Sequence, residues 1–373
     1  MDQSELDRWH MQRALELAAR GRGWVEPNPM VGCVIARGAE VIAEGWHRRF
    51  GGPHAEVEAI RMAGPRAKGA TLYVTLEPCC HFGKTPPCTC AILEAGISRV
   101  VASVVDPFPA VAGKGLEELR AAGVEVLCGV LEHEARSLLA PYLKLVGAGR
   151  PWVILKWAMT LDGKIATRTG KSRWISSPRS REVVHRLRGL VDAIIVGIGT
   201  VLADDPLLLP QVPGPRRPAR VILDSRARLP AESQLVRTCQ QAPVIVAVGP
   251  QASPDRTAML QAAGCEVLRF PQEDYQTRLL ALLDELGRRK MTYVLVEGGA
   301  QVFASFFECG EVDEIHAFIA PKVFGGQSAL GPVSGLGVAV PDEAWHLENP
   351  ATEVLDGDIY VHGRVKTAIR QKG

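Results

Sequence analysis

Four cysteines and a histidine lie within one short, turn-rich stretch of the sequence, TLEPCCHFGKTPPCTC at residues 75–90. Another histidine lies upstream, with a glutamate two residues after it, as His54-Ala55-Glu56. Thiolates and imidazoles are ligands that zinc prefers, and three such ligands leave the fourth tetrahedral position open for water. These residue types therefore predict a catalytic zinc site with a carboxylate beside it.

His54 and Glu56 can serve one site only under a geometric condition. Two residues apart on a helix, they lie about 200° apart around its axis. The site must therefore lie over the end of the helix rather than on its flank, and Pro53 is typical of such a helix start.

Among the clustered cysteines, Cys79 and Cys88 are the preferred ligand pair. Cys88 follows two prolines and is predicted to stand at a helix N-terminus, a position that favours a thiolate. Cys80 and Cys90 are expected to point away and are interpreted as packing residues. Two alternatives remain open: a structural zinc site that uses a fourth cysteine, and buried cysteines without metal.

The order His54-x-Glu56 followed by Pro78-Cys79 matches the H-x-E…P-C signature of zinc deaminases. In such a site Glu56 is not a ligand. It takes a proton from water and returns it to the ring nitrogen and leaving amine of the substrate. The pattern by itself predicts hydrolysis of an amidine-type amino group.

Length and composition predict a globular chain with roughly two cores. The 373 residues are 47% hydrophobic and 23% charged, and the apolar runs are shorter than the ~20 residues of a membrane span. An acidic start without an apolar leader, together with nine cysteines, an odd number, predicts a cytoplasmic protein. A net charge of +2 gives no electrostatic basis for binding nucleic acid.

Helical and strand patterns alternate along the whole chain, which favours two α/β domains, at residues 1–147 and 148–373. The turn-rich GAGRP at residues 147–151 marks the joint. In the first half, strands are predicted at 31–36, 41–45, 71–76, 99–104 and 124–127, and helices at 5–20, 55–63, 87–95, 115–122 and 131–146. In the second half, strands are predicted at 152–158, 193–197, 220–223, 244–248, 266–270 and 293–296.

A series of motifs in both halves closely resembles the bifunctional riboflavin-biosynthesis deaminase/reductase family. They are EPNPMVGCVI, PHAEVEAI, YVTLEPCCHFGKTPPC and DPFPAVAGKGLEELRAAG in the first half, and TLDGKIAT, SRWISSP, VLADDP, VEGG and APKVFGG in the second. The resemblance implies a cytidine-deaminase-like three-layer domain followed by a dihydrofolate-reductase-like domain. It also implies a homo-oligomer, Zn2+ and NADPH as cofactors, and a phosphorylated pyrimidine as substrate.

The resemblance further implies roles for individual residues. On the deaminase side it gives substrate contacts to Asn28, His47, Ala55, His81 and Lys84. On the reductase side it assigns NADPH to Ala158, Trp174, Thr200, Asp204, Ser225, Gly298 and Gly299, and the pyrimidine substrate to Ser172, Arg188, Leu208 and Glu297. Lys156 is the candidate to position or polarise the sugar carbon that receives hydride. Taken alone, each of these residues could equally be a turn, surface or core residue.

The second half carries no G-x-G-x-x-G fingerprint after a strand. VGIGTVLADD at residues 196–205 comes closest, and EGGA at 297–300 offers a second strand-to-helix turn where backbone amides can bind phosphate. After VLADDP the family usually has an arginine where this chain has Gln211, and a neutral amide cannot replace its bidentate phosphate contact. Arg216, Arg217 and Arg220, in the following Pro- and Arg-rich loop at 210–220, are the candidates to compensate.

Three functions remain to be separated. The leading prediction is the two-step enzyme, with a deaminase that has an impaired reductase as a variant of it. A nucleoside or tRNA deaminase would need its target base flipped into the pocket. A non-catalytic zinc-stabilised binding protein would not need Glu56.

Overall fold

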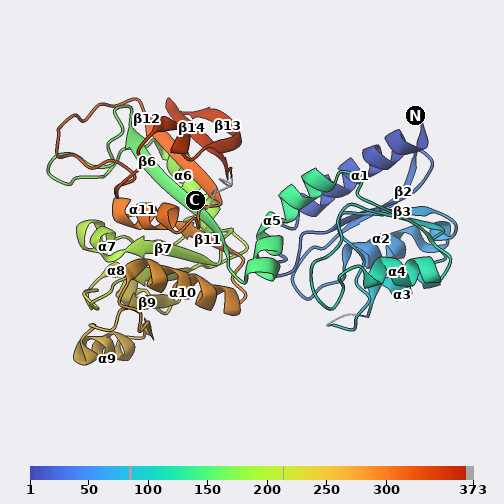
Figure 1. The fold of residues 1–373 in the computed structure, drawn as a ribbon, viewed down its shortest axis with the longest axis horizontal. Helices are drawn as coiled ribbons and strands as arrows, with labels where there is room; N and C mark the ends of the chain where they lie inside the picture. The colour runs from blue at the N-terminus through green and yellow to red at the C-terminus, as the bar shows by residue number, and fades with distance from the viewer. Residues whose placement is uncertain (84–85, 213, 367–373) are drawn as a thin grey trace. The chain divides into compact units, whose positions relative to one another are not determined.

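The computed structural model describes residues 1–83, 86–212 and 214–366, and its contacts divide the chain into two compact units that meet between Gly149 and Arg150. Each unit has its own sheet, flanked by helices (Figure 1). Among the described residues, none of the helices combines the length and apolarity that a bilayer span requires.

The first unit contains a five-stranded sheet in the order β2-β1-β3-β4-β5. Its strands are β1 (Gly32–Arg37), β2 (Glu40–Trp46), β3 (Thr71–Val74), β4 (Arg99–Ala102) and β5 (Glu125–Cys128). β1 runs antiparallel to β2 and β3, whereas β3, β4 and β5 are parallel. Its helices are α1 (Gln3–Ala19), α2 (Ala55–Ala63), α3 (Cys88–Glu94), α4 (Lys114–Ala121) and α5 (Glu132–Ala148).

Successive side chains of the strands point to opposite faces of this sheet, and each face packs in a separate hydrophobic core. Cys33 and Ile35 of β1 pack in a cluster with α2, α3 and α4, whereas Val34 and Ala36 pack in a cluster with α1 and α5. Gly32 lets α1 approach closely, because a Cβ there would come within 2.0 Å of the Ala14 carbonyl oxygen. The unit is therefore a helix–sheet–helix sandwich, as the predicted three-layer fold requires.

The second unit contains a nine-stranded sheet in the order β10-β9-β8-β7-β11-β6-β12-β14-β13. The strands are β6 (Trp152–Thr160), β7 (Ala193–Gly197), β8 (Ala219–Leu223), β9 (Val244–Val248), β10 (Glu266–Arg269), β11 (Tyr293–Val296), β12 (Glu314–Ala320), β13 (Leu347–Leu355) and β14 (Asp358–Val365). All are parallel from β10 to β12, and β14 and β13 add an antiparallel edge.

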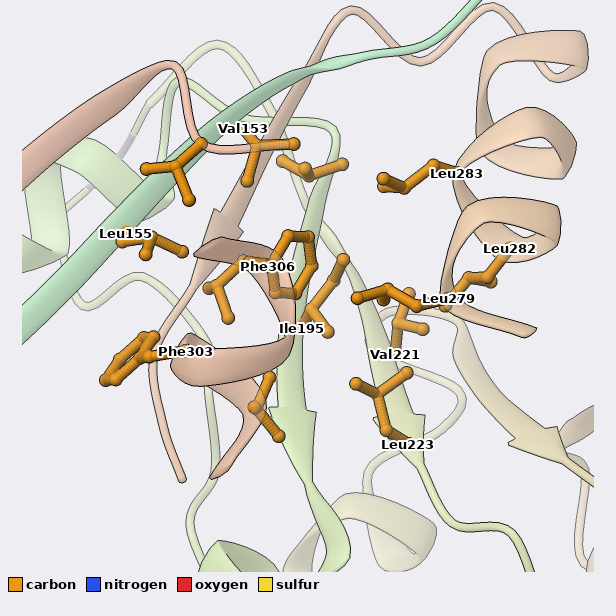
Figure 2. Close-up of a cluster of buried hydrophobic side chains, with 14 of the residues drawn as sticks. Val153, Leu155, Ile195, Val221, Leu223, Leu279, Leu282, Leu283, Phe303 and Phe306 are labelled. Carbon is orange, nitrogen blue, oxygen red and sulfur yellow. The ribbon is translucent and has the colours of Figure 1, made fainter. Parts of the chain in front are cut away.

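Helices connect the parallel strands and cover the sheet. They are α6 (Pro178–Arg188), α7 (Ile198–Asp204), α8 (Gln234–Arg237), α9 (Pro254–Ala262), α10 (Tyr275–Arg288) and α11 (Ala300–Glu308). Figure 2 shows leucines of α10 and two phenylalanines of α11, Phe303 and Phe306, facing side chains of β6, β7 and β8. Because the path from β6 to β7 passes over β11, the carboxyl ends of these three strands border a crevice where ligands bind in such sheets.

Candidate active sites

His54, Cys79 and Cys88 converge at one point of the first unit. His54 is the N-cap of α2 and Cys88 is the first residue of α3. The His54 Nδ1 atom lies 3.2 Å from the Cys88 sulfur and 3.5 Å from the Cys79 sulfur. In the described part of the chain they form the one His, Cys, Asp or Glu group that could hold a metal ion, with ligand atoms within 4.8 Å of one another.

The donor set and its spacing fit zinc. Tetrahedral bonds of ~2.3 Å to sulfur and ~2.1 Å to nitrogen place neighbouring S and N ligand atoms about 3.6 Å apart. The observed separations of 3.2 and 3.5 Å are close to that value. Cys80 instead directs its sulfur toward the Ala110 carbonyl oxygen at 3.8 Å, and Cys90 is exposed. The structure thus brings together the three predicted ligands and leaves the other two clustered cysteines apart.

Glu56 lies in the first turn of α2, beside the triad but outside it. Its side chain is 3% exposed, and its Oε2 atom has no hydrogen-bond partner among the described residues. Burial raises the pKa of this carboxyl group. A buried polar atom without a protein partner marks a place where a bound molecule completes the hydrogen bonding. Glu56 is therefore placed to exchange a proton with a ligand.

His47 holds Asn28 in one orientation near the metal centre. The His47 Nδ1 atom lies 2.9 Å from the Pro53 carbonyl oxygen, which only accepts, so Nδ1 is assigned the proton. Its Nε2 atom then accepts from the Asn28 amide nitrogen at 3.3 Å, which leaves the Asn28 carbonyl oxygen available. Burial lowers the pKa of His47, and its ring centroid lies 5.4 Å from that of His54.

The other predicted deaminase contacts lie in different surroundings. Ala55 is fully buried between His54 and Glu56. The His81 ring lies 5.8 Å from that of Phe108, and its Nδ1 atom is buried with no hydrogen-bond partner in the described residues. Lys84 lies outside the described residues.

Glu77, which no sequence motif marked as a functional residue, organises the turn that carries the metal ligand Cys79. Its buried carboxylate accepts hydrogen bonds from four backbone N–H groups, those of Asp106, Gly113, Gly115 and Leu116, at 2.9–3.2 Å. Glu77 thereby ties the Pro78-Cys79 turn to the start of α4. The one local signal is an acidic residue directly before Pro78 and Cys79.

In the second unit, a cavity of about 1760 Å³ lies at the carboxyl ends of the central strands. This exceeds the ~300–1,000 Å³ of a typical single-ligand pocket, so two ligands can occupy it together. All the predicted reductase residues line it: Lys156, Ala158, Ser172, Trp174, Arg188, Thr200, Asp204, Leu208, Ser225, Glu297, Gly298 and Gly299.

A buried charge cluster lies at the centre of this cavity. Glu297 binds Arg188 through two contacts of 2.5 and 2.8 Å, and the Lys156 nitrogen lies 4.0 Å from its carboxylate. Burial opposes the charge of Glu297, but Arg188 and Lys156 outweigh it and hold the pKa of Glu297 below its usual value. Burial lowers the pKa of Lys156. The cluster therefore places a weakly solvated amine beside an ionised carboxylate.

The turns after β7 and β11 form a cradle suited to the phosphates of a dinucleotide. A Cβ at Gly298 would lie 3.0 Å from the Thr200 hydroxyl, and Gly299 has a φ of 91°. Gly298 thus lets the turn after β11 approach Thr200 closely, and both turns line the cavity. The Ser172 hydroxyl donates to Asp204 at 2.9 Å at the rim of the same cavity.

None of the three arginines that were candidates to compensate for Gln211 lines the cavity. Arg216 forms an ion pair with Asp192. Arg220 is fully buried and donates to backbone carbonyls, including that of Thr238 at 2.8 Å. Arg217 is exposed and is not among the residues that line the cavity, whereas Gln211 lines it. No arginine of the 210–220 loop, as far as this loop is described, reaches the cavity wall.

Comparison with known proteins agrees with both sites. The RibD C-terminal domain matches residues 151–361, and the cytidine and deoxycytidylate deaminase zinc-binding region matches residues 4–104. Riboflavin biosynthesis protein RibD of Actinobacillus pleuropneumoniae is 41% identical over 352 residues, which are 94% of this chain and 93% of that protein. The chain belongs to the RibD family.

Solved structures of the family extend the match to both units. Acinetobacter baumannii RibD has a TM-score of 0.84 at 36% identity and covers 98% of this chain and 100% of that one. A Thermotoga maritima diaminohydroxyphosphoribosylaminopyrimidine deaminase/5-amino-6-(5-phosphoribosylamino)uracil reductase has a TM-score of 0.83 at 38% identity, with the same coverage. The predicted fold is confirmed, as are a bifunctional deaminase and reductase of riboflavin biosynthesis and its zinc and NADPH cofactors.

Proposed function

We propose that residues 1–147 deaminate 2,5-diamino-6-(5-phosphoribosylamino)pyrimidin-4(3H)-one and that residues 148–373 reduce the ribosyl group of the product to ribityl. The observation that carries this proposal is the pairing of two sites in one chain. One combines His54, Cys79 and Cys88 with a buried Glu56 whose Oε2 atom has no partner among the described residues, and the other is a dinucleotide-sized groove with a charged centre.

In the deaminase site, His54, Cys79 and Cys88 hold zinc, which when bound supplies Lewis-acid activation of water. Glu56 takes a proton from the water at Oε2 and passes it to the ring nitrogen and the leaving amine. Its burial, which raises its pKa, suits an acid that must also return the proton.

Five further residues contribute to substrate binding in this proposal: Asn28, His47, Ala55, His81 and Lys84. The Asn28 carbonyl oxygen, oriented through His47, accepts from an amino group of the substrate. Ala55 and His81 contribute to the pocket wall. Lys84 binds the substrate phosphate as a cation.

In the reductase site, the substrate lies against the charged centre. Ser172, Arg188, Leu208 and Glu297 bind it, and Lys156 positions or polarises the sugar carbon that receives hydride. NADPH supplies the hydride and is bound by Ala158, Trp174, Thr200, Asp204, Ser225, Gly298 and Gly299. The position of Gly298 and Gly299 on the cavity wall, at a strand-to-helix turn, supports a pyrophosphate there.

Both substrates are phosphorylated small molecules, and we propose a cytoplasmic homo-oligomer that binds neither nucleic acid nor membrane. The test is a mass-spectrometric product analysis with zinc-loaded protein and the phosphoribosylated diaminopyrimidinone, with and without NADPH. Replacement of an amino group by oxygen without NADPH, followed by NADPH-dependent gain of two hydrogens, is the expected result. If the protein only deaminates the substrate, its reductase is impaired. If neither reaction occurs, the proposal is wrong.

A further inference from the structure

Lys156, at the charged centre of the second unit, has an aromatic neighbour as well as a charged one. Its Nζ atom lies 4.0 Å from the Glu297 carboxylate and 6.0 Å from the centroid of the Phe318 ring, over the face of that ring. Phe318 lies on β12 and is fully buried. The negative face of an aromatic ring attracts an ammonium group, and more strongly where water is excluded. Phe318 is therefore placed to hold the charged end of Lys156.

The pairing of β6 with β12 explains this contact. Ala158 of β6 lies beside Phe318, and Lys156 lies beside His316. Residues paired in this way project from the same face of the sheet. Because the side chain of Ala158 ends at Cβ, the longer side chain of Lys156 can extend past it to the ring.

Tyr360 holds the Phe318 ring from the side of β14. In the strand order β12 lies between β6 and β14, and Phe318 is paired with Tyr360 across β12 and β14. The two rings stack with their centroids 4.5 Å apart and their planes at 10°. Val184 of α6 and Leu355 of β13 pack in the same cluster. The Phe318 ring thus cannot turn unless Tyr360 also moves.

A chain of hydrogen bonds fixes Tyr360 in turn. The Tyr360 hydroxyl lies 2.6 Å from Nδ1 of His316, and Nε2 of His316 lies 2.9 Å from Oε1 of Glu314. The other oxygen of Glu314 accepts from the indole N–H of Trp152 at 3.1 Å. Because a carboxylate only accepts, Nε2 of His316 is assigned the proton, and Nδ1 then accepts from the Tyr360 hydroxyl. His316 and Tyr360 are both buried, so each depends on the other for its hydrogen bond.

Other groups also set the charge of Lys156. The charged and titratable side chains around it are Glu297, Arg188, His185, His316 and His362. Burial lowers the pKa of Lys156, and Glu297 opposes that effect. A ring face that stabilises the ammonium form acts in the same direction as Glu297. Substitution of Phe318 alone leaves all five groups in the chain, so it isolates the contribution of the ring.

We propose that Phe318 is a positioning residue of the reductase, which holds the ammonium group of Lys156 at the sugar carbon. Tyr360, fixed by His316 and Glu314, keeps the ring in place. The proposal rests on the role of Lys156 in the proposed function. It extends the reductase centre to side chains that do not line the cavity and lie behind its wall.

Competitive labelling of the full-length protein with acetic anhydride over a range of pH, read at Lys156 by mass spectrometry, tests this proposal without turnover. Phe318→Leu removes the ring, so the ammonium form is less stable and the pKa of Lys156 should fall by about half a pH unit or more. The alkaline limb of kcat for NADPH-dependent reduction should move to lower pH by the same amount. Phe318→Tyr keeps an aromatic face and should keep the wild-type values.

Phe306→Leu is the matched control for loss of a buried ring. Phe306 is also fully buried, but it packs with Leu155, on the face of β6 opposite to Lys156 (Figure 2). This variant should leave the pKa of Lys156 unchanged. Tyr360→Leu removes the ring that supports Phe318, and it should lower the pKa of Lys156 in the same direction as Phe318→Leu.

An unchanged pKa of Lys156 in Phe318→Leu, or an equal fall in Phe306→Leu, would overturn the proposal. A wild-type pKa in Tyr360→Leu would overturn the supporting role of Tyr360. Lys156→Met separates these failures from failure of the proposed function. If Lys156→Met abolishes reduction in those cases, the proposed function stands and the role of Phe318 alone is wrong. Full reduction by Lys156→Met would contradict the role of Lys156 itself.

Discussion

Arg188 and Glu297 form a bidentate ion pair in the groove of the second unit, with contacts of 2.5 and 2.8 Å between residues 109 positions apart in the sequence. The pair joins the end of α6 to the turn after β11. It also holds Glu297 ionised next to Lys156, so the charge state of the proposed reductase centre depends on it.

Arg188→Lys should therefore impair the reductase selectively. A lysine keeps the charge but cannot form the planar two-point contact, so kcat/KM for NADPH-dependent reduction should fall by about 10- to 100-fold. Stopped assays of both activities on the same preparation check this. The deaminase of the same chain is the control, and its loss in parallel would indicate misfolding instead.

Glu56→Gln should abolish proton transfer and keep the shape of the deaminase site. Deamination should fall by about 10²- to 10⁴-fold, the usual contribution of a positioned acid or base. Metal analysis should show zinc retained, since Glu56 is not one of the three ligands. Unchanged deamination would favour a non-catalytic zinc site.

The two cysteines of α3 should behave differently when each is replaced by serine. Cys88→Ser removes a zinc ligand, so zinc affinity and deamination should both fall. Mutation of residues that only hydrogen-bond to metal ligands lowers metal affinity by ~10- to 100-fold, and loss of a ligand should lower it by at least as much. Cys90 is exposed and outside the triad, so Cys90→Ser should keep one zinc per chain. Chelation of zinc should stop deamination and spare NADPH-dependent reduction of the deaminated substrate.

The first unit should lose stability in acid through Asp7. Burial raises the pKa of Asp7, but hydrogen bonds from Arg99, Gln3 and Tyr73 outweigh that effect and hold the pKa below its usual value. A lowered folded-state pKa gives stability that is present above the unfolded value of ~3.9 and is lost as pH falls through the folded value.

Asp7→Asn should accordingly destabilise the unit by about 1.5–3 kcal/mol at pH 7, because the charged contacts with Arg99 at 2.7 and 2.8 Å are weakened. The difference from wild type should shrink below about pH 4. Urea unfolding followed by loss of deaminase activity at each pH measures it. A difference that stays constant with pH would mean that the carboxylate charge contributes nothing.

Gln211→Arg should improve the reductase. Gln211 lines the groove, whereas none of the arginines of the described part of that loop does. A restored guanidinium should lower KM for the phosphorylated substrate by about tenfold. Gln211→Lys is a useful comparison with a smaller expected gain, and an unchanged KM in both would show that another group already binds the phosphate.

The metal centre was predictable from the sequence because its parts are local. His54 and Glu56 stand at one helix start and Cys88 at another, so spacing and helix geometry determine where they point. The role of Glu77 was not predictable, since its partners lie 29–39 residues away and are backbone groups, which carry no residue-type signal.

In the second unit, the parallel strands were predictable from short apolar runs, but β12, β13 and β14 were not identified. β13 is exposed along most of its length, so no buried pattern distinguishes it from a loop. Arg220 was considered as a loop cation although it also begins the strand predicted at 220–223, and a strand pattern alone does not show which way its first side chain points. The strand starts at Ala219 and turns the arginine side chain inward.

The four backbone N–H groups that donate to Glu77 also restrict which residues can replace it during evolution. Glu77 contacts neither the candidate metal ligands nor the substrate in the proposed mechanism, yet a shorter Asp or an uncharged Gln would leave some of those amides unsatisfied in a buried place. Selection should therefore hold this position nearly as strictly as a zinc ligand. Substitutions of Glu77 would be selected against because they change the shape of the site, not because they remove a group that takes part in the reaction.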